Sequence, residues 1–269
     1  MRGADGPDIQ GMEHALPMVL PDPPEPEITA LARRYARAGG PVVMILTRLG
    51  GSFERQLAAL PEGLRMRVGQ ATEAALAASW GLADLGARAL PKAAGKAGRH
   101  GTMAAAVASG AAGGAGGLAT SLAELPVTVT VILHAIRAEA VAAGYDPADP
   151  SVRADCLKVF AAGSPLAGDD GVDTSFLSAR MTLTGPALQQ LIQTVAPKLA
   201  AALSQKLAAQ AVPVLGAATG AALNAAYLAY YRELAAIRFA LRRLGERHGE
   251  MPVLEAFRRA TTPPPVTRA

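Results

Sequence analysis

Two long stretches without charge, built mainly of alanine and glycine, constrain this chain more than any other feature. The first, GTMAAAVASGAAGGAGGLATSLA, covers residues 101–123, and the second, LAAQAVPVLGAATGAALNAAYLAYY, covers residues 207–231. Alanine is the best helix former and a poor strand former. It is also the largest part of the 51% hydrophobic share, because aromatic residues make up only 4%. The sequence therefore predicts an all-α protein.

Small residues recur at every fourth position in both stretches. The spaced glycines are Gly110 and Gly114, Gly113 and Gly117, and Gly216 and Gly220. Residues four apart share one face of a helix, and a face without side chains lets two helix backbones approach closely. We therefore expect a compact multi-helix bundle with two central Ala/Gly-rich glycine-zipper helices.

The ends of the chain differ in composition from its middle. Residues 1–27 are rich in proline and acidic residues, which predicts a disordered acidic leader. Residues 28–260 are expected to form a single helical domain, and residues 261–269 a disordered tail. The first residues lack the pattern of a secretory signal peptide, so we expect a cytoplasmic protein.

Glycine and proline signals divide the middle of the chain into expected helices. These are residues 27–38, 41–60, 61–90, 101–123, 127–143, 151–162, 174–182, 185–207, 214–247 and 252–260. Residues 92–99 are expected to connect two of them, and residues 124–126 to interrupt the chain before the next helix. Gly144 is expected to end a helix, and Asp146 or Asp149 to cap the next one. Residues 163–173 are expected to form a polar loop.

Both uncharged stretches are long enough to span a membrane. They contain few large apolar side chains, and alanine and glycine gain little energy from burial. Three interpretations stay open: a soluble bundle with tight small-residue packing, a protein that inserts these segments reversibly, and a constitutive protein with two spans. The arginine-rich helix over residues 232–247 is expected to face anionic headgroups.

Glu124 is the only charged residue between His100 and Arg137. An isolated carboxylate at the end of an apolar helix needs a partner. The candidate polar cluster consists of Glu124, His134, Arg137 and Asn224. Asn224 follows the spaced glycines of the second stretch much as Glu124 follows those of the first. A structural polar network is the favoured interpretation, and an acid–base site is the alternative.

Composition disfavours several other classes of site. Cys156 is the only cysteine, so neither an intrachain disulfide nor a zinc site with several thiolates can form. The four histidines are far apart in sequence, so we expect no metal ion, and nothing in the sequence indicates a cofactor. The net charge of +4 is modest, and aromatic residues are sparse around the basic segment, so we expect no nucleic-acid partner.

Two blocks of the sequence resemble the bacterial EcsC family. The first is ELPVTVTVILHAIRAEAVAAGYDPADPSVRADCLKVFAAGS, residues 124–164, and the second is VPVLGAATGAALNAAYLAYYRELAAIRFALRRLGERHG, residues 212–249. The resemblance covers about residues 60–250. The positions that match the family motif are Glu124, Pro126, Asp146, Pro213, Gly216 and Asn224. The family tends to have Tyr-Gly at the turn where this chain has Gly-Tyr, so only Asp146 carries over there.

The leading hypothesis is a non-enzymatic, membrane-associated helical protein, in which the two glycine-zipper helices pack together or against lipid. The family is named for a protein encoded beside an ABC transporter, which implies a link to transport or to the cell envelope, with transporter components as partners. The membrane lipid surface and self-association are the other expected partners, at the inner face of the cytoplasmic membrane. Two alternatives stay open: a hydrolase with a buried site centred on Glu124, and a soluble protein that binds lipid or acyl chains.

Overall fold

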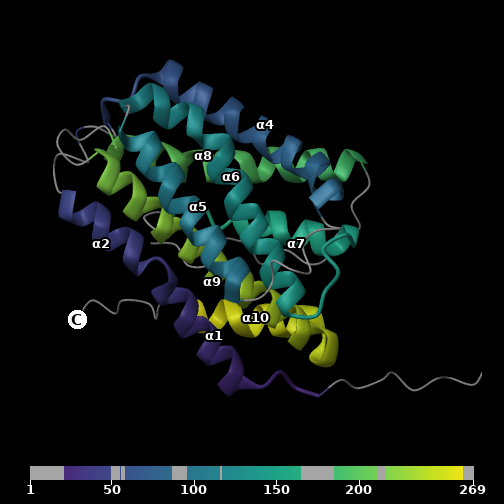
Figure 1. Ribbon diagram of the computed structural model, residues 1–269. Helices are drawn as coiled ribbons and strands as arrows, with labels where there is room; N and C mark the ends of the chain where they lie inside the picture. The colour runs from purple at the N-terminus through teal and green to yellow at the C-terminus, as the bar shows by residue number, and fades with distance from the viewer. Residues whose placement is uncertain are drawn as a thin grey trace, which may run out of the picture.

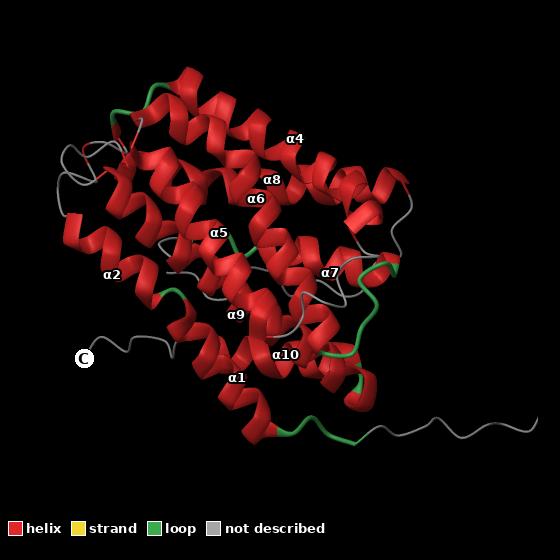
Figure 2. Ribbon diagram, viewed as in Figure 1, coloured by secondary structure: helices red, strands yellow, loops and turns green. Residues whose placement is uncertain are grey.

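The computed structural model describes residues 21–49, 55, 58–86, 96–115, 117–164, 185–210 and 216–262. Within these ranges every regular element is a helix, and Figure 2 shows no strand among them. The predicted all-α, multi-helix fold is confirmed. The helices are α1 (Glu25–Ala38), α2 (Gly40–Leu49), α4 (Glu62–Gly86), α5 (Lys96–Ala115), α6 (Gly117–Ala142), α7 (Pro150–Phe160), α8 (Gly185–Gln210), α9 (Gly216–His248) and α10 (Glu250–Thr261).

The long helix α9 lies at the centre of the bundle. It packs against α5 and α6, and it also contacts α1, α2, α7, α8 and α10. Figure 1 shows α4 and α8 along one edge and α1 with α10 along the opposite edge. Leucines and aromatic residues of α9 supply much of the core, and they include Leu223, Leu228, Tyr231, Leu234 and Phe239. The second uncharged stretch therefore begins the helix around which the others assemble.

Glycine allows α5 and α9 to approach each other closely. A Cβ atom built on Gly110 would overlap the backbone carbonyl of Gly220 and would lie 2.8 Å from Nδ2 of Asn224. Only a residue without a side chain fits at this crossing. Gly110 and Gly220 belong to the small-residue stripes that the sequence indicates.

The first uncharged stretch does not form one helix. Helix α5 ends at Ala115, and α6 begins at Gly117. Both boundaries lie in residues 113–117, where four of five residues are glycine and helix propensity is low. The prediction of an interruption at residues 124–126 was wrong, because α6 continues through Pro126. The prediction of a connector at residues 92–99 was also wrong in part, because α5 already begins at Lys96.

The turn between α6 and α7 follows the predicted capping signals. Gly144 has a φ of +91°. The backbone N–H of Tyr145 donates to the Ala140 carbonyl at 3.0 Å, and that of Gly144 donates to Val141 at 3.0 Å, which together form a Schellman motif. Asp149 caps α7 by accepting from Ser151, with Pro150 at the first helical position. Asp146 instead accepts from the Ala148 backbone N–H at 2.8 Å within the turn.

Several boundaries differ from the expected ones. Helix α1 begins at Glu25, inside the stretch assigned to the leader, and α8 runs through Pro197. Helix α10 ends at Thr261. Some predictions concern residues outside the described ranges. These are residues 1–20, 165–184, 211–215, which include Pro213, and 263–269.

One stretch of the described residues, Leu122–Ala142 in α6, has the length and apolar composition of a membrane-crossing helix. It starts at the end of the first uncharged stretch, and more than half of its most apolar window is buried in the bundle. The buried side chains of this stretch include Val129, Ile132 and Ile136. In the structure these residues belong to the hydrophobic core.

Candidate functional site

Glu124 lies in a buried polar network where α6 meets three other helices. Its carboxylate accepts hydrogen bonds from Nζ of Lys206 on α8 and from Oγ1 of Thr128, one turn further along α6. It also accepts from Nδ2 of Asn224 on α9 at 2.9 Å. Both carboxylate oxygens are therefore engaged by side chains of the protein.

Lys206 and Asn224 extend this network. Nζ of Lys206, which is fully buried, also donates to Oγ1 of Thr128 at 2.9 Å. Nδ2 of Asn224 donates to the Ala106 carbonyl at 2.9 Å and to Oγ of Ser109 at 3.1 Å, both on α5. The Glu124 network, which we define as Glu124, Thr128, Lys206, Asn224 and Ser109, thus connects α5, α6, α8 and α9.

The electrostatics favour an ionised Glu124. Burial raises the pKa of its carboxyl, but the Lys206 charge and the hydrogen bonds from Lys206, Thr128 and Asn224 outweigh burial and lower the pKa. A Cβ on Gly113 would stand 3.1 Å from Oε2 of Glu124, so α5 also packs closely here. A carboxylate that is ionised and bound on both oxygens suits a structural network better than proton transfer.

The structure separates the four residues of the predicted cluster. It brings Glu124 and Asn224 into direct contact. His134 and Arg137 lie 10 and 13 residues further along α6, which is about 15 Å and about 20 Å along the helix axis. Nη2 of Arg137 donates to the Pro147 carbonyl at 3.4 Å, and burial together with the Arg137 charge lowers the pKa of His134.

Lys206 and Thr128 belong to the network, and sequence reasoning did not identify them. A signal for Lys206 exists in the sequence. Lys206 follows Leu199 and Leu203 at helical spacing, and all three are buried in the structure. A lysine on the apolar stripe of a helix needs a buried anion. For Thr128, the one sequence signal is its position four residues after Glu124, which places the two side chains on the same face of a helix.

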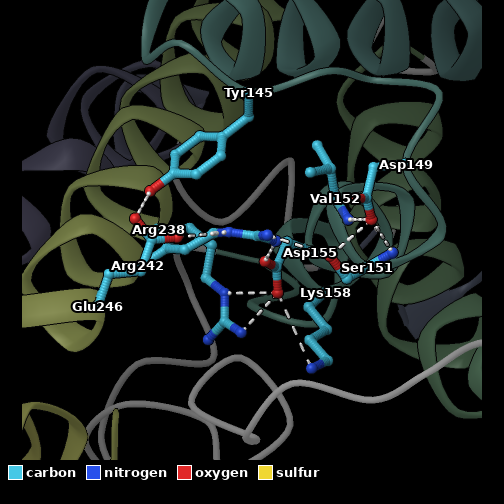
Figure 3. Close-up of polar contacts among 9 residues, drawn as sticks. All are labelled: Tyr145, Asp149, Ser151, Val152, Asp155, Lys158, Arg238, Arg242 and Glu246. Atoms are coloured by element: carbon cyan, nitrogen blue, oxygen red, sulfur yellow. Dashed lines mark hydrogen bonds and ion pairs between the residues drawn. The ribbon is translucent and has the colours of Figure 1, made fainter. Parts of the chain in front are cut away.

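A second buried ion cluster joins α7 to α9 around Asp155, as Figure 3 shows. Oδ1 of Asp155 accepts from Nη2 of Arg238 at 2.6 Å, and Oδ2 accepts from Nη1 of Arg242 at 2.7 Å. Burial raises the pKa of Asp155, but the charges and hydrogen bonds of the two arginines lower it overall. Arg242 also stacks over the Tyr145 ring, with its guanidinium carbon 4.6 Å from the ring centroid.

Two further residues of α7 have pKa values that burial shifts. Burial and the Arg238 charge lower the pKa of Lys158 to about 8, although Asp155 is close, with Nζ 3.9 Å from its Oδ1. Burial raises the pKa of the Cys156 thiol to about 12. Cys156 is therefore an unreactive core residue in the folded protein.

The arginines of α9 point in two directions. Arg238 and Arg242 turn into the bundle toward Asp155, and Arg232 lies 3.7 Å from a carboxylate oxygen of Glu139. The arginines of residues 232–247 were expected to face anionic headgroups. The structure instead turns Arg232, Arg238 and Arg242 toward carboxylates of the bundle. Arg243 and Arg247 are exposed. Among the described residues, no three His, Cys, Asp or Glu side chains lie close enough to hold a metal ion.

The fold and its two buried clusters define an all-helical bundle tied internally by ion pairs between helices that are distant in sequence. The sequence profile of the EcsC protein family matches residues 82–244, which include both clusters. The chain therefore belongs to the EcsC family. No curated protein and no solved structure matches the chain.

Proposed function

We propose that this protein is a non-enzymatic helical protein that binds the lipid surface of a membrane. The observation that carries the proposal is an uncharged surface on α5 and the first half of α6. From residue 101 to residue 130 the only charged residue is Glu124, and its side chain is buried. The exposed residues of this uncharged surface are Gly101, Ala104, Ala105, Val107, Ala108, Ala112 and Ala115 on α5 and Thr120, Ala123, Pro126, Val127 and Thr130 on α6.

Two of these residues are large apolar side chains open to solvent. Val107 is 39% exposed and Val127 is 50% exposed. An uncharged helical surface gives up little hydration on meeting the acyl boundary of a bilayer, and its apolar area favours contact. Arg99, a half-exposed side chain at the start of α5, would meet the negative surface of anionic lipids. The occupied carboxylate of Glu124 supports the non-enzymatic part of the proposal.

Flotation with vesicles of phosphatidylethanolamine and phosphatidylglycerol tests the proposal. The parent protein should float with the vesicles. The double variant Val107→Glu/Val127→Glu should lower its partition coefficient by about tenfold or more, since each charge near an anionic surface is worth about 1 kcal/mol. The matched control is Met251→Glu, because Met251 is an exposed apolar residue on α10, away from the uncharged surface.

Each outcome bears on the proposal. Floating that both the double variant and Met251→Glu weaken equally would assign binding to overall charge and would contradict a role for the uncharged surface. A parent protein that stays out of the lipid fraction would refute membrane binding altogether. Salt added in a parallel sample reports the electrostatic share, because ions screen the attraction to headgroups within about 10 Å at 0.1 M.

A further inference from the structure

Helix α6 carries its charges at its ends and none in between. Its charged residues are Glu124 near the start and Arg137 and Glu139 near the end. The 12 residues between Glu124 and Arg137 contain no acidic or basic residue other than His134, and they measure about 18 Å along a helix. This uncharged segment alone is shorter than a bilayer-crossing helix, although Leu122–Ala142 as a whole has that length. An apolar segment of about 10–14 residues is typical of a core helix or of a segment at the membrane interface.

Every charged residue of α6 is held by another part of the bundle. Glu124 is paired with Lys206 of α8. Glu139 lies 3.3 Å from Nη2 of Arg99 on α5 and 3.7 Å from Nε of Arg232 on α9. Arg137 bonds to the carbonyl of Pro147 in the turn before α7. The apolar face of α6 is thus kept inside the bundle by polar contacts as well as by packing.

The start of α6 is the end that can separate from the bundle. Helix α5 ends at Ala115, and α6 begins at Gly117. Pro126 lies inside the helix, where it removes a backbone hydrogen bond and weakens the first turns. The outer residues here, Pro126 and Val127, belong to the uncharged surface. Glu124 is the charged residue that anchors this end, and Lys206 is its ionic partner.

We propose that the Glu124–Lys206 ion pair is a latch that holds α6 in the bundle and that opens at a lipid surface. Opening turns the apolar face of α6 toward the acyl boundary, while Glu124 and Arg137 at the two ends of the uncharged segment stay in the headgroup layer. There water and headgroups solvate the separated charges, so the ion pair costs less to break than it does in the core. The inference rests on the proposed membrane binding and adds a conformational step to it.

Thiol protection tests the latch in the full chain. Ala135 is buried on α6, and Ala135→Cys places a small thiol there. Cys156, buried on α7, reports opening of the whole bundle in the same molecule. We would expose the protein to N-phenylmaleimide, which partitions into lipid, with and without vesicles of phosphatidylethanolamine and phosphatidylglycerol. Mass spectrometry of peptides then gives the alkylation rate at each position.

The latch predicts that vesicles accelerate alkylation at position 135 and leave Cys156 protected. Lys206→Met leaves a buried carboxylate without its cation, so it should raise the rate at position 135 on vesicles by about tenfold or more. In Glu124→Met/Lys206→Met, two apolar side chains of similar length should return the rate toward that of the parent. Asp155→Asn is the matched control, because it breaks a buried ion pair that does not involve α6.

The results separate the latch from the membrane binding on which it rests. Protein that floats while position 135 stays protected would refute the latch and leave the proposed binding intact. Rates that rise together at position 135 and Cys156 would also refute the latch, because general unfolding would then explain the exposure. An equal rise at position 135 alone in Asp155→Asn would refute it too, because opening would then not depend on the Glu124–Lys206 pair. Protein that does not float would overturn the proposed function itself.

Discussion

Lys206 and Glu124 form an ion pair in the core of the bundle. Lys206 is fully buried, and its Nζ donates hydrogen bonds to both Glu124 and Thr128 inside the core. A buried ion pair of this kind contributes little net stability compared with apolar residues, but losing one partner leaves a charge without compensation. The Asp155 cluster follows the same rule with two arginines around one carboxylate.

The first prediction concerns this dependence. Lys206→Met should lower the free energy of unfolding by about 3–5 kcal/mol, because Glu124 stays buried without its cation. The double variant Glu124→Met/Lys206→Met should recover most of the loss. Chemical denaturation of the two single variants and the double variant forms a double-mutant cycle. Additive losses would show that the two side chains do not act as a pair.

Single residues also show what sequence alone could and could not provide. Asp149, Pro150 and Gly144 were predictable, because capping depends on neighbours within a few residues. A contact between Glu124 and Asn224 was predicted because each of these polar residues follows a pair of spaced glycines, and the structure places the two side chains 2.9 Å apart. Lys206 was not predicted as a partner of Glu124, because it lies 82 residues further along the chain. Nothing in the sequence around Glu124 indicates which lysine or arginine pairs with it.

Helices α5 and α9 approach each other closely. Their backbones meet at Gly110 and Gly220, with the amide of Asn224 beside them. Both glycines lie on the stripes of small residues from which the sequence predicts close packing. The break between α5 and α6 was placed wrongly at Pro126, because a proline inside a long helix can be tolerated when surrounding helices hold it, whereas the glycine run at residues 113–117 cannot hold a helix together by itself.

A glycine-to-alanine comparison on α5 tests the close approach. Gly110→Ala should destabilise the protein by about 1–3 kcal/mol, because its Cβ would overlap the Gly220 carbonyl and push the helices apart. Gly101→Ala on the same helix is the control, since nothing lies within 4 Å of its Cβ position. There the better helix propensity of alanine should add up to about 1 kcal/mol. Thermal or chemical unfolding of both variants measures the two changes in stability. Equal changes in Gly110→Ala and Gly101→Ala would contradict the close contact.

For the whole molecule, the two buried clusters tie the bundle together at separate places. The Glu124 network joins α5, α6, α8 and α9, and the Asp155 cluster joins α7 to α9. Both depend on α9, which is also the helix with the most neighbours. Stability of the bundle should therefore depend on the ionisation of both carboxylates.

This dependence gives a prediction for acid. The folded state lowers the pKa of Glu124 and of Asp155. Their contribution is therefore complete above the unfolded values, which lie at about 4, and it is lost as the pH falls through the lower folded values. Denaturation between neutral pH and acid should show stability falling below about pH 5. Glu124→Gln and Asp155→Asn should each flatten the slope, and an unchanged slope in both would refute the assignment.

The long sequence separation of these pairs has a consequence for synthesis on the ribosome. Asp155 meets Arg238 83 residues later in the chain, and Glu124 meets Lys206 82 residues later. At roughly 5–20 residues per second, each carboxylate waits about 4–16 s for its cation to be made. During that interval α6 and α7 cannot take their final places without an uncompensated buried charge. We therefore expect α6 and α7 to take their final places only after α8 and α9 have been made.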